Sequence, residues 1–513
     1  MRLPGTVTAR SGSNRDFFDS DVSDWHQKEK DGIMVLKGAD HMQADAGKKQ
    51  QLFETVPVPK AITAMAVPTI ISQLVNLVYN MVDTLYIGMT GDAYKTAGVT
   101  LAFTLFMMTI SFANLFGIGG GSLIARLSGA GRQEKAKSVS AFSFYAAIVV
   151  ALAYSLLVFI LLDPILLLFG ASAQTIVYAR QYVWQVVIFG NVPVILSMTC
   201  AHLLRNAGYA RQASMGLSGG GVLNILLDPL FMFVLLPRGL EVYGAALATL
   251  VSNIVSCTYL VVVMKKVSAT SPLSISLRDA LSIRREETKS LFSVGVPSAV
   301  LTGLFDVANI FLNSLMASHG DLQLAAIGIV MKAERFPNAI NIGICQGMLP
   351  LVAYNYTSGN WDRMKEVIRT ARLYGLAVAG VSLVFFECFA SGIVHLFLST
   401  STGNVADSVA TIGFAAVFLR LRCTASIPQF LNYSTSFCLQ AVGDGRDTLL
   451  HAVVRELVFY IPFMFVLDRL FGTTGLASAL TVGEICGAVF AVILLERWKR
   501  KRLVRAVGVG SES

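Results

Sequence analysis

The chain has 513 residues, of which 54% are hydrophobic and only 14% are charged, and its formal net charge is +9. Because a soluble domain carries roughly 25% charged residues, this composition excludes a soluble protein and indicates a membrane protein. The positive charge could favour nucleic acid, but the basic residues are concentrated in alternate loops between apolar stretches. That pattern is typical of membrane topology, so we expect no nucleic-acid partner.

Residues 1–55 are predicted to form a disordered polar extension. The first 50 residues carry eight basic and eight acidic side chains, and they contain no apolar segment typical of a signal peptide. Met34 and Met42 lie within this extension, and either could be the true start of the chain. We therefore expect the folded part to begin near residue 56.

Twelve apolar stretches follow, each near the length of about 20 residues that a helix needs to span a bilayer. The expected spans are 61–88, 97–124, 138–162, 183–208, 216–236, 244–264, 289–316, 324–352, 374–398, 411–440, 450–471 and 475–496. Basic residues cluster after every second span and in the C-terminal tail. The positive-inside rule therefore predicts a multi-pass protein of the cell membrane with both termini in the cytoplasm.

The twelve spans divide into two similar halves. Val67 and Pro68 in the first span match Val296 and Pro297 in the seventh, and residues 204–211 match residues 439–446 in their Leu, Gly and Arg positions. Both halves begin on the cytoplasmic side, so the repeats are parallel and related by an axis along the membrane normal. We predict an all-α polytopic membrane protein with twelve transmembrane helices in two pseudo-symmetric six-helix lobes around a central cavity. The expected divisions are an N-terminal lobe (56–264), a cytoplasmic amphipathic linker (265–288) with a helix over 276–292, a C-terminal lobe (289–496) and a basic cytoplasmic tail (497–513).

A polar stripe lies on the first span. Asn76, Asn80 and Asp83 are spaced i, i+4 and i+7, so a helix places them on one face. A charged side chain at the centre of a span costs about 2.5–3.5 kcal/mol on insertion scales, so an acid in this position is a candidate for function.

The fifth span carries a second acid in a similar setting. Asn224 and Asp228 are four residues apart and share one helical face, and Pro229 leaves the carbonyl of Ile225 without its usual donor. Carboxylate, amide and carbonyl oxygens suit a small cation, and a buried carboxylate equally suits a proton because burial disfavours its charged form.

The seventh span has its own stripe, formed by Asp306, Asn309 and Asn313. In the repeat Asp83 aligns with Leu312, so the halves have diverged in chemistry. The remaining acids within spans are weaker candidates: Glu334, Glu387, Glu456 and Glu484. Glu334 and Glu456 are adjacent to Arg335 and Arg455, so charge compensation or a gate is as good an interpretation as ion coupling.

Several motifs together resemble the MATE (multidrug and toxic compound extrusion) family, in its bacterial or archaeal branch. The residues that carry the resemblance are 82–88, 224–229, 244–249 and 350–356, and it covers about residues 55–500. The resemblance implies an exporter that exchanges amphipathic, often cationic, organic compounds for Na+ or H+. It also implies a cation-coupling site at the positions Asp83, Asn224, Asp228 and Thr249, and an acid in the seventh span that Asp306 matches only approximately. The two polar stripes add candidates for a substrate or second coupling site: Asn76, Asn80, Asp306, Asn309 and Asn313.

Our mechanistic hypothesis links the ion to the first span. Cation entry from outside neutralises Asp83 and Asp228, the span bends near its hinge at Pro68 or Gly88, and the cavity of the first lobe collapses and releases the compound. The many Phe and Met residues are expected to line that cavity, because such surfaces adapt to diverse apolar shapes. The expected partners are small amphipathic molecules and the lipid bilayer, and we expect the protein to be a monomer.

The sequence leaves alternatives open. The same oxygens serve Na+ and H+, and no other cofactor is expected: the seven cysteines and six histidines show no metal-ligand spacing, so no metal is expected beyond Na+ at the coupling residues. A lipid-linked sugar or oligosaccharide flippase of the same superfamily is the first rival. It would have extra spans or a strongly basic cavity, whereas we place only Arg420 and Arg422 plainly within a span. An intramembrane enzyme is less favoured, since no nucleophile with a base is evident, and we predict that the protein is not an enzyme.

Overall fold

The computed structural model describes residues 47, 50–398 and 405–509, and the side chains of 50–395 and 409–498 within them. The chain divides into two compact units, Met1–Gln51 and Leu52–Ser513, and every element below belongs to the second. Nearly all of the extension predicted over 1–55 therefore lies outside the described residues, as do residues 510–513 of the predicted tail.

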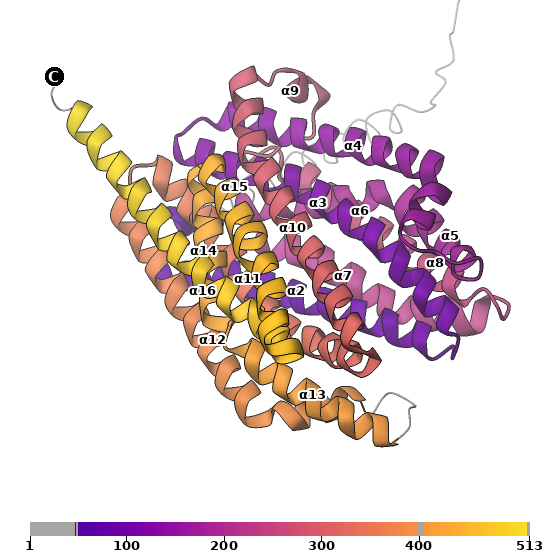
Figure 1. Ribbon diagram of the computed structural model, residues 1–513. Helices are drawn as coiled ribbons and strands as arrows, with labels where there is room; N and C mark the ends of the chain where they lie inside the picture. The colour runs from indigo at the N-terminus through magenta and orange to yellow at the C-terminus, as the bar shows by residue number, and fades with distance from the viewer. Residues whose placement is uncertain (1–46, 48–49, 399–404, 510–513) are drawn as a thin grey trace, which may run out of the picture. The chain divides into compact units, whose positions relative to one another are not determined.

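Every regular element of the described chain is a helix (Figure 1). The helices before the linker, which we call the N-terminal lobe, are α2 (Val58–Gly88), α3 (Ala93–Gly129), α4 (Gln133–Leu168), α5 (Thr175–Val183), η1 (Trp184–Phe189), α6 (Asn191–Asn206), α7 (Ala210–Pro229), η2 (Leu230–Leu235) and α8 (Glu241–Val267). After α9 (Leu277–Leu281) comes the C-terminal lobe, formed by α10 (Arg285–His319), α11 (Asp321–Thr357), α12 (Trp361–Leu398), α13 (Val405–Cys423), α14 (Ser426–Val442), α15 (Gly445–Val453), η3 (Val454–Tyr460) and α16 (Ile461–Val509).

These helices make twelve membrane spans. Length and hydropathy identify nine candidate spans in the described residues, and eleven when two bent pairs are each counted as one span. One of the nine, Gly445–Trp498, has 54 residues and passes through Gly472, whose φ of 59° and ψ of −141° are not helical. A helix of 54 residues would measure about 80 Å, whereas the hydrocarbon core is about 30 Å thick, so this segment crosses twice. The predicted fold class is confirmed.

Breaks in the helices recur in corresponding spans of the two lobes. In the fourth span α5 and η1 meet α6 at 50°, and in the tenth span α13 meets α14 at 48°. The π-helices η2 and η3 lie in the fifth and eleventh spans. Sharp bends and π segments need a local interruption of the i→i−4 hydrogen bonds. Their recurrence in both lobes supports the repeat inferred from the sequence.

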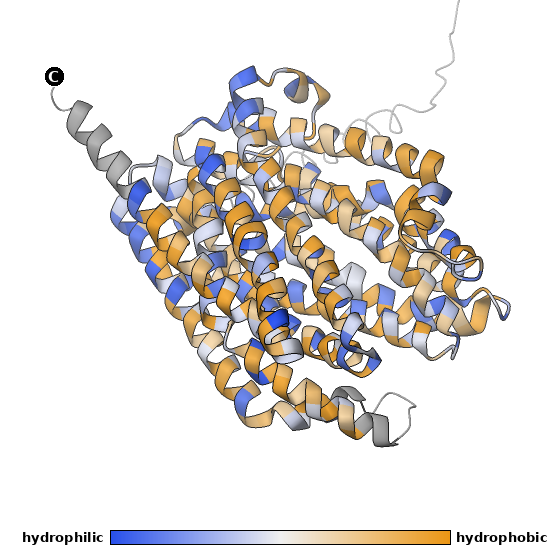
Figure 2. Ribbon diagram, viewed as in Figure 1, coloured by the Kyte–Doolittle hydropathy of each residue, from blue (hydrophilic) through white to orange (hydrophobic). Residues whose placement is uncertain are grey.

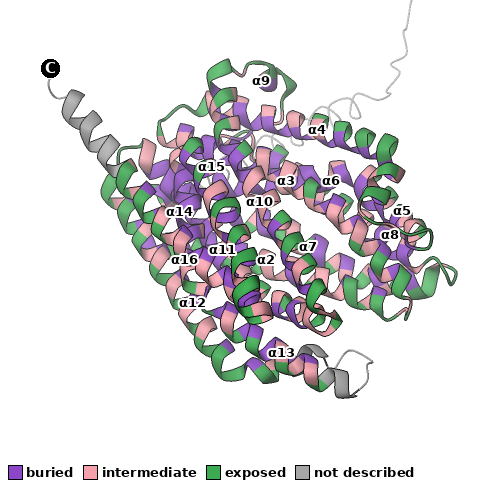
Figure 3. Cartoon of the chain, viewed as in Figure 1, coloured by how far each residue is buried: buried purple, intermediate pink, exposed green. Residues whose placement is uncertain are grey.

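The outer faces of the spans are apolar. Figure 2 shows hydrophobic residues along α4 and α12, and Figure 3 shows exposed positions on the same helices. Leu156, Ile160, Val381 and Val384 are examples of exposed apolar side chains on these two helices. A soluble protein does not expose apolar surface of this extent, so these faces are of the kind that membrane-spanning helices present.

The linker differs from the single amphipathic helix predicted over residues 276–292. It forms the short helix α9, then three residues without helical structure, and then the start of α10, because Arg284 is extended with φ −94° and ψ 159°. The chain before α9 packs on α4, where Ser140 Oγ donates to the carbonyl of Ser274 at 3.0 Å and accepts from its N–H at 3.1 Å. Contacts with another helix, rather than amphipathic periodicity, set the path of this segment.

The two lobes meet through close contacts between helices, at α2 with α11 and at α3 with α10. A Cβ on Gly347 would lie 2.7 Å from Ala66 Cα, and one on Gly119 would lie 2.8 Å from Gly295 Cα. Glycine therefore allows these backbones to approach closely, as small residues do between membrane helices. In each of these four helices, the contacting segment lies on the side of the bundle where α2 and α10 begin and α3 and α11 end.

On the opposite half of the bundle, the glycines of α2 and α11 lie in open space. Gly88 at the end of α2 and Gly328 near the start of α11 have no neighbouring atom within 4 Å of an added Cβ. Among the glycines that the structure describes, close contacts between α2 or α3 and the C-terminal lobe are therefore confined to one side.

We expect Gly347→Ala to destabilise the contact between α2 and α11. The added methyl group would meet backbone atoms of Ala66 at 2.7 Å, and overpacking of this kind costs about 1–3 kcal/mol. Gly328→Ala on the same helix is the matched control, because it meets open space and gains helix propensity of about 1 kcal/mol. Thermal unfolding in detergent should show a lower midpoint for Gly347→Ala only. Equal midpoints for the two variants would contradict the close packing.

Candidate functional site

A cavity of about 400 Å³ lies between the two lobes. Its walls come from α2, α3, α6, α7 and α8 of the N-terminal lobe and from α10, α11, α14 and η3 of the C-terminal lobe. Asn114 on α3 donates a hydrogen bond to Thr302 Oγ1 on α10 at 3.1 Å across this space. The volume is within the range of pockets that bind drug-sized molecules.

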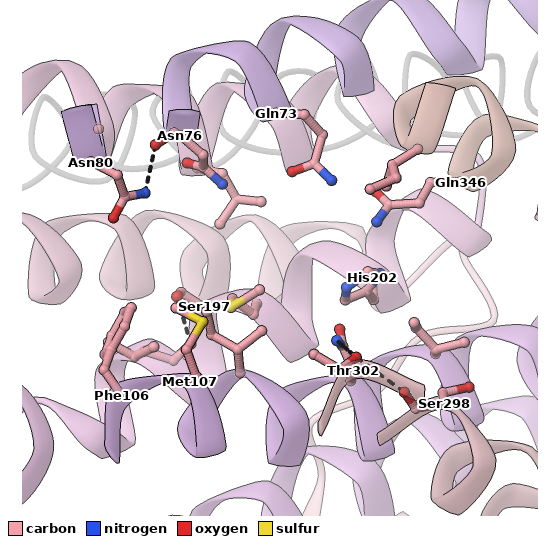
Figure 4. A pocket seen from close by; sticks show the side chains of 18 of the residues that line it. Gln73, Asn76, Asn80, Phe106, Met107, Ser197, His202, Ser298, Thr302 and Gln346 are labelled. Atoms are coloured by element: carbon pink, nitrogen blue, oxygen red, sulfur yellow. Dashed lines mark hydrogen bonds between the residues drawn. The ribbon is translucent and has the colours of Figure 1, made fainter. Parts of the chain in front are cut away.

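The lining of the cavity is rich in amides rather than in Phe and Met. Figure 4 shows Asn76 and Asn80 along one wall, with Phe106 and Met107 opposite them. The full set of lining amides is Gln73, Asn76, Asn80, Asn114, Asn224, Asn253, Gln346 and Gln440, whereas Phe and Met contribute only Phe106, Met107, Met198, Phe305 and Phe437. The expectation of a wall made of Phe and Met is therefore wrong. Other Phe and Met residues of the described chain are buried between packed helices, as Phe116 is, or exposed, as Phe389 is.

A buried polar cluster lies beside the cavity in the N-terminal lobe. Asn224 Nδ2 donates to Asp228 Oδ1 at 3.0 Å and is 3.3 Å from Thr249 Oγ1. Asp83 accepts a hydrogen bond from the Tyr182 hydroxyl at 3.4 Å, and the two carboxyls lie close enough for their charges to interact. Asp228 is fully buried and Asp83 is 9% exposed. The structure thus gathers the four residues proposed for cation coupling into one region.

The cluster has unused acceptors for a cation. Asp83 Oδ1, Asn224 Oδ1 and Asp228 Oδ2 are buried oxygens without a hydrogen-bond partner. An unsatisfied buried acceptor is unfavourable, and oxygens of these kinds bind hard cations or, in the case of a carboxylate, a proton. The donor set therefore fits Na+ or H+ equally well. Asn224 and Thr249 also line the cavity, so the cluster lies directly behind its wall.

Glycines bring α7 against its two neighbours at this point. A Cβ on Gly221 would lie 2.9 Å from Val75 Cγ1 on α2, and one on Gly220 would lie 2.9 Å from Ser256 Cβ on α8. The close approach puts Asn224, one turn further along α7, next to both helices. Pro229 ends α7, and the π-helix η2 follows directly. The missing donor at Pro229 thus coincides with a change in helix type.

The predicted hinge residues differ in their surroundings. Helix α2 is continuous through Pro68, and Gly88 is its last residue, followed by the C-cap Met89. A bend within the span could therefore arise at Pro68, where a helical hydrogen bond is lost, whereas Gly88 stands at the helix end.

The polar stripe of the seventh span is separate from the cavity. Thr302 and Phe305 line the cavity, but Asp306, Asn309 and Asn313 are absent from its lining. Asn313 is exposed, and Asp306 is half-buried with Arg335 close enough for their charges to interact. The structure does not bring these three residues together with Asn76 and Asn80, which do line the cavity.

Three of the four weaker acids form ion pairs within the C-terminal lobe, whereas Glu387 accepts a hydrogen bond from Cys423 Sγ at 3.6 Å. Glu334 is paired with Arg422, 88 residues away, through hydrogen bonds of 2.9 and 3.1 Å from Nε, rather than with the adjacent Arg335. Arg455 donates to both carboxylate oxygens of Glu484, at 3.0 and 2.5 Å, and lies 3.6 Å from Glu456. Charge compensation is thus what the structure supports for Glu334, Glu456 and Glu484.

Two arginines line the cavity that the sequence did not place there. Arg205 on α6 and Arg455 on η3 line the cavity, so the expectation that only Arg420 and Arg422 lie within a span is wrong. The signal was present, because Arg205 falls inside the predicted span 183–208 and a charge there is a functional candidate by the rule applied to Asp83. Arg205 was instead counted with Arg211 as part of the basic loop that follows this span.

Two lobes of six membrane helices with a cavity between them define a class, that of the secondary transporters built from repeats. The sequence profile of the MatE family matches residues 68–230 and 297–466, once in each lobe. The chain belongs to the MatE family, and the resemblance seen in its motifs is confirmed.

Relatives and solved structures agree with this assignment. A multidrug export protein, MepA, of Staphylococcus saprophyticus is 30% identical over 451 residues, which cover 87% of this chain and 96% of the relative. The fold matches the crystal structure of MATE in complex with MaL6 with a TM-score of 0.81, at 24% identity, over 89% of this chain and 98% of that one. It also matches a MOP superfamily transporter from Pyrococcus furiosus with a TM-score of 0.80, at 24% identity, over 88% and 97%.

Proposed function

We propose that this protein is a secondary active exporter that exchanges amphipathic organic compounds for Na+ or H+. The observation that carries the proposal is the position of the buried Asp83–Asn224–Asp228–Thr249 cluster directly behind the wall of a cavity of about 400 Å³ between the lobes. The multidrug export role of the MepA relative supports it. We further propose that the protein acts as a monomer in the cell membrane, without catalysis and with both termini in the cytoplasm.

The proposed coupling depends on two residues that belong to both the cluster and the cavity. Asn224 and Thr249 line the cavity, and Asn224 donates to Asp228. When H+ neutralises Asp228, this carboxyl becomes a poorer acceptor and the Asn224 amide is free to reorient, whereas Na+ would draw Asn224 Oδ1 toward the carboxylates. Ion occupancy therefore changes the donors presented to the transported compound, which is the differential interaction that coupling requires.

The same proposal assigns a conformational state to this structure. The lobes are in close contact on the side where α2 and α10 begin, which the charge distribution predicts to be cytoplasmic. The arrangement is then closed toward the cytoplasm, and transport requires the contacts at Gly347 and Gly119 to open. Bending of α2 at Pro68, close to Ala66 and Ile70 in that contact, is the proposed way to release it.

The test is uptake of rhodamine 123 into inside-out vesicles that contain the full chain. We expect dye accumulation when the lumen supplies an outwardly directed gradient of the coupling ion, either Na+ or H+, and none in vesicles without the protein. The ion that drives accumulation identifies the coupling. Failure of both gradients to drive uptake would overturn the proposal.

A further inference from the structure

The charged side chains in the cavity lining are cationic. Among the described lining residues, the only charged ones are Arg205 and Arg455, and neither Asp nor Glu is present. Asp83 and Asp228 lie behind the wall rather than on it. This polarity contrasts with the cationic compounds expected from the family resemblance, because a cavity selects ligands of complementary charge.

Arg455 is already neutralised by its own lobe. It donates two hydrogen bonds to Glu484, at 3.0 and 2.5 Å, and Glu456 lies 3.6 Å away. A guanidinium paired in this bidentate manner has little charge left for a ligand.

Arg205 has no such compensation. It is 2% exposed, its Nε has no hydrogen-bond partner, and no carboxylate in the described chain forms an ion pair with it. The contact that the structure gives its guanidinium is Nη1 with His202 Nδ1 at 3.4 Å. Its place in the last turn of α6 supplies part of the compensation through the helix dipole, but a buried unpaired charge stays unfavourable.

The surroundings hold Arg205 in place at the cavity. A Cβ on Gly117 would lie 2.7 Å from His202 Cδ2, so glycine in α3 provides the space for the imidazole that contacts Arg205. Figure 4 shows His202 at the cavity between α2 residues and Thr302. Because Arg presents five N–H donors in a planar fork, most of them remain unused at this position.

We infer that the cavity takes amphipathic compounds that carry a carboxylate, and that Arg205 binds this group while the amide-rich wall holds the remainder. This inference rests on the proposed export function and names the substrate class of the same cavity. Removal of the charge should abolish the selectivity for the carboxylate without closing the cavity.

The test compares two dyes that differ in one group. Rhodamine 110 has a free carboxylate, and rhodamine 123 is its methyl ester. With the purified full chain in phosphatidylcholine nanodiscs, fluorescence polarisation should show the carboxylate binding about ten-fold or more tightly, the size of a charge-assisted hydrogen bond. Arg205→Gln should remove this preference, so that the two dyes bind with similar affinity. Gln440 occupies the matching position of the second repeat, so glutamine is compatible with this helix end.

The controls separate this inference from the proposed function. Arg211→Gln removes an exposed charge of the same lobe outside the cavity and should keep the wild-type preference. Equal binding of the two dyes by the wild type, or a preference that survives Arg205→Gln, overturns the carboxylate site; ion-driven uptake of dye into vesicles would then still support export. No ion-driven uptake of either dye overturns export, and the carboxylate inference with it.

Discussion

Replacement of Asp83 or Asp228 by Asn is expected to abolish ion-driven export while folded protein remains in the membrane. Asn is a neutral amide of similar shape, so either variant resembles the ion-loaded cluster and cannot alternate between charged and neutral states. Both carboxyls are buried and each has an oxygen without a partner, so the fold does not depend on their charge for an ion pair. The measurement is dye accumulation in inside-out vesicles, with the amount of protein determined by immunoblot.

The matched control for these variants is Asp163→Asn. Asp163 is an acid of the same lobe whose side chain is 50% exposed in a pair with Arg180, and exposed pairs contribute about 0–1 kcal/mol to stability. We expect wild-type accumulation in this variant. Wild-type accumulation in Asp83→Asn and Asp228→Asn as well would rule out the cluster as the coupling site.

The largest loss of stability is expected from Arg455→Met. Removal of this guanidinium leaves Glu484 and Glu456 buried without a cation, and removal of one partner from a buried ion pair costs about 3–5 kcal/mol. Thermal unfolding in detergent should show a much lower midpoint than wild type. Arg446→Met, at an exposed arginine of the same lobe, should be close to wild type.

A second variant distinguishes lost pairing from lost packing. When Glu484→Met is added to Arg455→Met, one uncompensated charge is removed and part of the stability should return, since apolar replacement of both partners of a buried pair is often neutral. A double variant that unfolds as easily as Arg455→Met alone would show that packing of the arginine, rather than its charge, stabilises this region.

Local spacing predicted those parts of the site that lie on one helix. Asn224 and Asp228 are four residues apart, and the structure joins them by a hydrogen bond of 3.0 Å. The helical period fixes such neighbours wherever the helix is placed. The family resemblance added Thr249, which lies 3.3 Å from Asn224 on a different helix.

The chain order of residues does not reveal partners between helices. Sequence neighbours suggested Arg335 for Glu334, whereas the structure pairs Glu334 with Arg422. The contact of Asp83 with Tyr182 joins positions 99 residues apart. Such pairs depend on where glycines allow two helices to approach and on how the helices are rotated about their axes, and neither is a property of a single span.

By itself the sequence determined the class of protein, the twelve spans, the two-fold repeat and the presence of acids within the membrane. These follow from the length of apolar runs and from the energetic cost of a charge in lipid, which are summed residue by residue. Only the tertiary structure decided which side chains line the cavity. It placed Arg205 on the wall without an acid and left Asp306 outside, because a cavity is formed by the surfaces that several packed helices leave uncovered.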